Sequence, residues 1–139
     1  MNADDFSNLH KSLTKNIEEI KSMVKNKTFL KEPENVKSLE RLKYLFYSLI
    51  KSLIDIGHSI VLENDFRDPL NRADIFISLA ENKIILPSVV PGVKKAVIAL
   101  PRINSTGPEE ITELIGASIN DLHKCLDSFV VYFKLKDKT

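Results

Sequence analysis

The sequence predicts an all-α protein, an up-and-down antiparallel bundle of four to five helices. Three observations predict this fold class. Apolar residues recur at steps of three and four along most of the chain, which is the helical period. The 139 residues include only four glycines, so few tight turns are available to a strand-rich fold. Prolines fall where the apolar stretches begin or end, since proline inside a helix would be costly.

Strands and a second domain have little support in the sequence. The strand candidates are the apolar runs 84–86 and 129–133, and each is too short or too helical in its period to carry a sheet. The length and the 43% hydrophobic content suit one domain, residues 1–139, with a core of its own.

The first helix is expected from Asp4 to Asn26. Its apolar positions form a narrow stripe, typical of a helix that packs in a bundle. These positions are Phe6, Leu9, Leu13, Ile17, Ile20 and Val24. Asp4, Asp5 and Ser7 are the candidate N-cap residues, because their side-chain oxygens can accept the unpaired N–H groups of the first turn.

The second helix is expected to be the longest, from Glu34 to Glu63. A break over 27–34 precedes it, and Pro33 suits its start. After Tyr44 the apolar residues cover most of the circumference, so this helix should be buried on more than one side. It is therefore expected to be central or to serve a subunit interface. Tyr44 and Tyr47 are interpreted as core or interface residues rather than platforms for stacking bases.

Two shorter helices are expected next. After a polar loop at 64–69, the third helix should cover Asn71 to Lys83. Its inward residues should be Ala73, Phe76, Ile77 and Ala80. Pro87 and Pro91 should bracket a short turn, and the fourth helix should follow from Gly92 to Leu100.

The last helix should follow a loop. Pro101 cannot continue the fourth helix without cost, and the composition of 102–108 is that of a loop. Thr106 is the expected cap of the last helix, with Glu109 and Glu110 favourably placed in its first turn. The apolar face of this helix is expected to contain Ile111, Leu114, Ile115, Ile119, Leu122, Leu126, Phe129 and Phe133.

Charge and composition exclude several functional classes. The net charge is +1, with 20 basic and 19 acidic side chains, whereas a nucleic-acid coat protein usually has a strong basic excess. The lysines of the first helix and of the C-terminal tail are interpreted as solvated helix faces. The single cysteine, Cys125, permits no internal disulfide and is expected to be a buried small hydrophobe.

No cofactor, metal or membrane is expected. The sequence has no phosphate-cradling glycine loop, paired-carboxylate motif or metal-ligand cluster. It has no apolar signal core at Met1–Asp5, and no apolar run is expected to approach the length of a membrane span. We therefore expect a cytoplasmic protein.

Several stretches resemble one known family. The sequence from Tyr44 to Ile60 is similar to the second helix of HepT-like proteins, a branch of the HEPN helical-bundle family. Asp68-Pro69 followed by 73–85, which includes Leu79-Ala80-Glu81, is similar to that family's third-helix pattern, and 111–126 resembles its final helix. The resemblance extends over roughly 42–133. It implies an all-α bundle, usually a homodimer, and often a toxin ribonuclease encoded beside a minimal nucleotidyltransferase antitoxin.

The resemblance also implies a site. The family's ribonucleases use an arginine, a polar residue and, a few residues further on, a histidine. Histidine transfers protons near neutral pH, and arginine neutralises a phosphate with a fixed fork of donors. Arg102 matches the arginine, and Asn104 takes the polar place one position later than expected. Where the histidine should stand, this chain has Thr106, Gly107 and Pro108.

Asp55 and His58 are a second candidate pair. They lie three residues apart, so they share a helix face, and the family resemblance includes them. A functional interpretation makes them an acid–base pair or part of a substituted site. A structural interpretation makes them a satisfied buried pair at a helix or dimer contact.

Three hypotheses remain open from the sequence. The leading one is a catalytically degenerate HepT-like homodimer that binds a minimal nucleotidyltransferase antitoxin or RNA. The alternative is an active, metal-independent endoribonuclease that uses Arg102 with a histidine outside the motif, His58. In both, the candidate residues are Arg102, Asn104, His58 and Asp55. The third is a scaffold with no role in nucleic-acid binding.

Overall fold

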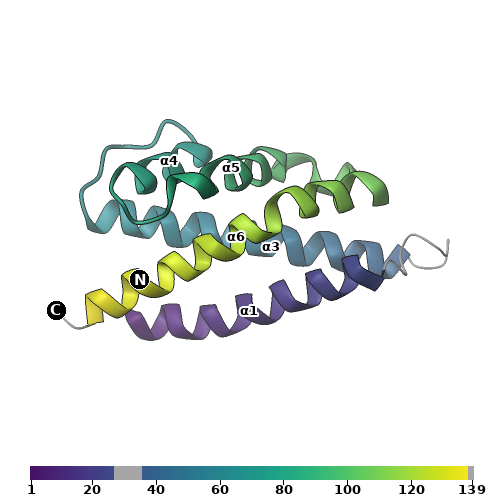
Figure 1. Cartoon of the computed structure of the whole chain (residues 1–139), viewed down its shortest axis with the longest axis horizontal. Coiled ribbons are helices and arrows are strands. Elements are labelled where there is room, and N and C mark those ends of the chain that lie inside the picture. The colour runs from purple at the N-terminus through teal and green to yellow at the C-terminus, as the bar shows by residue number, and fades with distance from the viewer. Residues whose placement is uncertain (27–35, 138–139) are drawn as a thin grey trace.

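The computed structural model describes residues 1–26 and 36–137. The expected break at 27–34, the role of Pro33 and the expected helix start at Glu34 lie outside the described residues. So does Lys138 of the basic tail. Figure 1 shows the whole arrangement.

The described residues form α-helices and two short 3-10 helices, with no strand among them, and the all-α prediction is confirmed. The elements in chain order are α1 (Ala3–Asn26), α3 (Val36–Glu63), α4 (Arg72–Glu81), η1 (Pro87–Val89), α5 (Val90–Ala99), η2 (Leu100–Ser105) and α6 (Pro108–Asp137).

The three long helices lie along one another, and the two short helices α4 and α5 lie together on one side of them (Figure 1). The start of α1 meets the ends of α3 and α6. There the rings of Phe6 and Phe133 stack with centroids 4.3 Å apart, and the Tyr132 hydroxyl donates to Glu63 Oε2 at 2.7 Å. Helix α1 is therefore antiparallel to both α3 and α6.

Helix α3 is central, as its apolar pattern predicts. It packs against α1, α4, α6 and η2. Its fully buried residues include Leu42, Phe46, Leu49, Ile50, Leu53, Ile56 and Ile60. Gly57 lets α4 pack closely, because a Cβ at this position would lie 3.1 Å from the side chains of both Ile75 and Leu79.

One strip of α3 nevertheless faces solvent. It contains Tyr44, Tyr47, Asp55, His58 and Leu62, with the half-buried Lys51 between Tyr47 and Asp55, at steps of three and four residues. Because Tyr44 is 65% exposed and Tyr47 is 38% exposed, the prediction that they are core residues is wrong. Their role at a subunit interface stays a prediction.

The same helix corrects the expectation about membrane spans. By length and composition, Lys37–Glu63 is long and apolar enough to cross a membrane, so the expectation that no run approaches that length is wrong. The apolar character has another explanation in the bundle, since 56% of the most apolar window is buried inside the protein. A central helix needs apolar residues on every face that another helix covers.

The N-cap of α1 differs from the prediction. The side-chain Oδ1 of Asn2 accepts the backbone N–H of Asp5 at 2.8 Å. The helix begins at Ala3, one residue earlier than expected, so Asp4 and Asp5 lie inside the first turn instead of before it. The prediction of Asp4, Asp5 or Ser7 as the cap is therefore wrong, and Asn2 is the N-cap of α1.

The segment between α4 and α6 is more helical than predicted. Helix α5 begins at Val90 with Pro91 in its first turn, so Pro91 starts the helix instead of bracketing a turn. The predicted loop after Pro101 is largely the 3-10 helix η2, which begins at Leu100 with Pro101 as its second residue. The predicted cap of α6 is also wrong, because the Thr106 hydroxyl donates to the Ile103 carbonyl at 2.6 Å and so closes η2.

Candidate functional site

Arg102 lies on η2 with its side chain toward solvent. The side chain is 61% exposed, and its Nε is 4.0 Å from Oε1 of Glu110, which is itself 58% exposed. An ion pair this long and this exposed contributes little to stability. The Arg102 guanidinium is therefore available to bind an external anion.

The backbone that carries Arg102 is held firmly. Ile103 is fully buried, and Thr106 is buried beside it with its hydroxyl on the Ile103 carbonyl. The Ser105 hydroxyl donates to the carbonyl of Arg102 at 2.9 Å. These contacts present Arg102 from a fixed position.

Lys43 ties this segment to α3, and sequence reasoning missed it. Its side chain is 5% exposed, and Nζ donates to the backbone carbonyl of Asn104 at 3.2 Å. The bond uses the backbone carbonyl of Asn104, whose side chain is exposed, and the expected role of that side chain at the site stays a prediction. The available signal was a lysine directly after Leu42 in a largely apolar stretch of the helix, where an ammonium group that became buried would need a partner.

The side chains of this segment suit anion binding better than proton transfer. An exposed guanidinium can hold a phosphate through two parallel donors. Residues 100–107 contain no histidine, carboxylate or thiol that could accept or donate a proton. The nearby carboxylate of Glu110 faces the arginine, where it would repel a phosphate.

Asp55 and His58 are both exposed on the open strip of α3. Asp55 accepts a hydrogen bond from Lys51 Nζ at 3.1 Å, one turn before it. The interpretation as a satisfied buried pair is wrong for the protomer, because both side chains are exposed there. The interpretation that a second subunit covers the pair stays a prediction.

Two hollows adjoin Asp55 and His58, one of about 480 Å³ and one of about 390 Å³. The first is also lined by Met1, Ser59, Leu62 and Glu63. The second is also lined by Lys51, Ile54, Pro69, Asn71, Arg72 and Ile75. The imidazole of His58 is thus accessible from two sides.

The structure does not bring Arg102 and His58 together within one protomer. The segment of Arg102 touches α3 at Lys43, and His58 lies fifteen positions further along that helix. At the rise of an α-helix this places His58 roughly 22 Å away along the axis. A joint site would need residues from two protomers.

The remaining histidines and the cysteine lie elsewhere. His10 packs against the ring of Phe6 with centroids 5.9 Å apart, so it is partly covered instead of freely exposed. His123 Nδ1 lies 3.2 Å from Lys21 Nζ on the surface. Cys125 is fully buried, and this desolvation raises the pKa of its thiol far above the ordinary range, which confirms it as a buried small hydrophobe. In the described ranges no group of three or more potential ligands could hold a metal ion.

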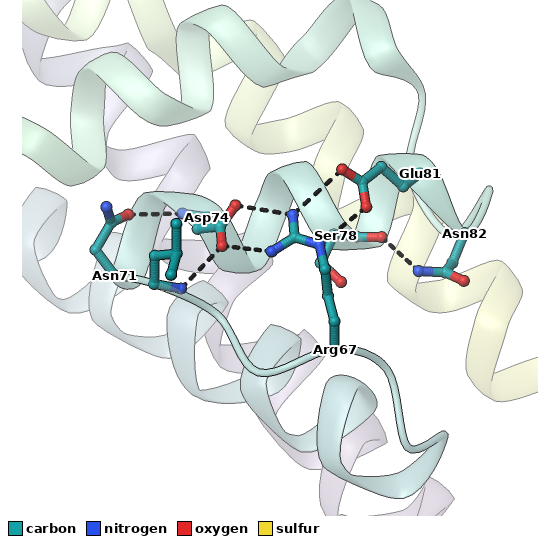
Figure 2. A network of polar contacts seen from close by, with 7 residues as sticks. Arg67, Asn71, Asp74, Ser78, Glu81 and Asn82 are labelled. Carbon is teal, nitrogen blue, oxygen red and sulfur yellow. Dashed lines mark hydrogen bonds and ion pairs between the residues drawn. The ribbon is translucent and has the colours of Figure 1, made fainter.

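A polar network fixes the connection between α3 and α4 (Figure 2). The Arg67 guanidinium donates to both carboxylate oxygens of Asp74, at 2.6 and 2.9 Å, and to both oxygens of Glu81, at 3.1 and 3.2 Å. Asp74 also accepts the backbone N–H of Leu70 at 2.8 Å, while Asn71 caps α4 by accepting the N–H of Asp74. The network therefore holds the loop onto the first turn of α4.

This network predicts an acid-dependent part of the stability. The Arg67 hydrogen bonds, with the Leu70 N–H, lower the pKa of Asp74 from 3.8 to about 2. A carboxyl group with a lowered pKa in the folded state stabilises the fold fully above its ordinary pKa, and this stabilisation is lost as pH falls through the folded value. We expect urea unfolding of Asp74→Asn to show a shallower loss of stability than wild type between about pH 4 and pH 2. Equal slopes would contradict the assignment, and Asp127→Asn, which removes a surface carboxylate, is the matched control.

Comparison with known proteins gives a fold likeness. No protein-family model and no curated protein matches the chain. The cytosolic protein of unknown function YutE from Bacillus subtilis is similar in structure, with a TM-score of 0.72 and 18% identity over 94% of this chain and 92% of that chain. Two mutant forms of the toxin-antitoxin MntA-HpeT give TM-scores of 0.77 and 0.78 at 16% and 17% identity, over 91% and 92% of this chain and 98% of theirs. At such identities the likeness shows the shared fold.

Proposed function

We propose that this chain is a HepT-like protein of the toxin-antitoxin type that binds RNA or a nucleotidyltransferase antitoxin without cutting RNA. The observation that carries the proposal is Arg102, held on a rigid segment and exposed, with no proton-transferring histidine in that segment. The fold shared with the toxin-antitoxin MntA-HpeT supports the family, because the likeness covers nearly all of both chains.

The missing chemistry supports binding over catalysis. Cleavage of RNA needs a base to activate the 2′-hydroxyl and an acid to protonate the leaving oxygen. Arg102 can stabilise charge on a phosphate, but a guanidinium offers only hydrogen-bond donors and no acceptor, so it cannot take the proton from a 2′-hydroxyl. A chain with the arginine alone would therefore keep affinity for phosphate and lose turnover.

The proposal includes a cytoplasmic homodimer. The exposed strip of α3 is the surface we assign to self-association, because its large apolar side chains Tyr44 and Leu62 are 65% and 62% exposed. Large exposed apolar side chains that share one face often mark an interface.

An active ribonuclease remains the second candidate, and one observation favours it. His58 is exposed beside two hollows, so a second protomer could bring its Arg102 to this imidazole. In that case inactive Arg102→Ala and inactive His58→Ala chains, when mixed, would form dimers with one complete site and regain cleavage.

We expect the purified chain to bind labelled single-stranded RNA without cleaving it, in buffer that contains a metal chelator. Arg102→Ala should weaken binding in fluorescence anisotropy. It should also make the plot of log affinity against log salt less steep, by the amount that about one phosphate contact contributes. Arg41→Ala is the matched control, because Arg41 is 57% exposed but bonded to Glu19.

Cleavage of the RNA by the wild-type chain that disappears in Arg102→Ala would contradict this proposal. If cleavage also returned when the Arg102→Ala and His58→Ala chains were mixed, the second candidate would stand. Equal effects of the Arg102 and Arg41 substitutions would show that RNA binds by surface charge alone.

A further inference from the structure

An apolar groove runs between the two short helices, α4 and α5, which lie side by side in Figure 1. We call it the α4–α5 groove; its volume is about 670 Å³. It is lined by Leu70, Asn71, Arg72, Ala73, Asp74, Ile77, Lys94, Val97, Ile98 and Pro101. None of the residues proposed above to bind RNA or to form the dimer lines it.

The lips of the α4–α5 groove expose large apolar side chains. Leu70 is 88% exposed and Ile98 is 58% exposed, and Pro101 is exposed beside them. A lone exposed leucine is ordinary on a protein surface. Two such side chains on opposite sides of one apolar groove form a continuous surface, which is the usual form of a site for an amphipathic helix.

The charges around the groove select the partner. Arg72 and Lys94 line it and are exposed, and neither has an ion-pair partner among the described residues. Asp74 is the acidic residue of the lining, and both of its oxygens are already bonded to Arg67. The groove therefore offers two uncompensated cations around an apolar floor.

We propose that the α4–α5 groove binds an amphipathic helix of a protein partner, with apolar residues toward the floor and acidic residues toward Arg72 and Lys94. This inference rests on the proposed function only in assuming a protein partner. A second copy of the chain fits less well, because a two-fold contact through this groove would set the same cations against each other. RNA also fits less well, because no aromatic side chain lines the groove to stack on a base.

The test uses two labelled synthetic peptides with leucines at helical i, i+3, i+4 and i+7 positions. One peptide carries glutamates beside the leucines, and the other carries lysines. We expect the acidic peptide to bind the full chain about tenfold more tightly or better in fluorescence anisotropy, since about 1.4 kcal/mol of charge preference gives that ratio. Leu70→Ser and Ile98→Ser should each weaken it by about tenfold, and Lys94→Glu should reverse the preference between the peptides. Leu135→Ser, at a side chain that is 62% exposed on α6, is the matched control.

Other outcomes would overturn the inference. Equal affinity for the two peptides, or a loss of binding in Leu135→Ser as large as in Ile98→Ser, would exclude a charge-selective groove. Self-association of the chain that Ile98→Ser abolishes would assign the groove to a second copy, and loss of RNA binding in Ile98→Ser would assign it to RNA. The peptide assay contains no RNA, so peptide binding by a chain that fails the RNA assay would leave the groove standing without the proposed function.

Discussion

Gly92→Ala is expected to destabilise the protein by about 1–3 kcal/mol, the usual cost of forcing an extra group into a packed contact. Gly92 lies in the first turn of α5, against α6. A Cβ there would lie 2.1 Å from Oδ2 and 2.9 Å from Cβ of Asp121. The carboxylate can rotate away, but the Asp121 Cβ moves only with the backbone of α6. Chemical denaturation of the purified variant measures the loss.

Gly116→Ala is the matched control for this prediction, because Gly116 is also helical but has nothing within 4 Å of an added Cβ. Alanine is the better helix former, so this variant should gain about 0.5–1 kcal/mol. Asp121→Ala in the Gly92→Ala background should recover part of the loss, since it removes the carboxylate contact and leaves the Cβ contact. A gain in stability at both glycines would mean that helix propensity, and not the approach of α5 to α6, decides the effect.

Asp74→Ala is expected to cost about 1.5–3 kcal/mol, the range for losing hydrogen bonds to a charged group. The side chain of Asp74 is 10% exposed, and it bonds the guanidinium of Arg67 and the N–H of Leu70. Without it, the loop loses its attachment to α4 and one lip of the α4–α5 groove loses its support. Urea denaturation measures the loss of stability, and the acidic peptide measures the effect on the groove.

Glu81→Ala separates the two acidic partners of Arg67. The Glu81 side chain is 52% exposed and bonds only the arginine in this network, so its removal should cost clearly less than removal of Asp74. If Glu81→Ala lowered the free energy of unfolding as much as Asp74→Ala, the ion pairs of the Arg67 guanidinium would be the main source of stability. The bond from Asp74 to the Leu70 N–H would then contribute little.

Most of the fold was predictable because the helices are local. The stripe in α1, the predominantly apolar α3 and the proline at the start of α6 each follow from residues within a few turns of one another. The errors in caps and helix bounds lie at helix ends, where several residues can serve as the cap. Asn2, Asp4, Asp5 and Ser7 all have suitable oxygens, and only the first helical residue decides which of them becomes the cap.

The candidate site was predictable only in part. The sequence located Arg102 and the absence of a histidine near it, since both are matters of order along the chain. It did not reveal that Lys43 reaches the carbonyl of Asn104, or that Asp55 and His58 lie on the one open strip of α3. Exposure of a helix face depends on which neighbours cover it.

The sequence by itself determined an all-α protein, the approximate helix ranges and the presence of Arg102 in a segment with no histidine. These properties arise from the helical period and from short-range backbone constraints. Only the tertiary structure decided that Arg102 and His58 are far apart in the protomer, that Arg67 bonds Asp74 and Glu81, and that Leu70 and Ile98 flank one groove. The physical reason is that these relations depend on how helices distant along the chain pack side by side, and no local pattern encodes which helices become neighbours.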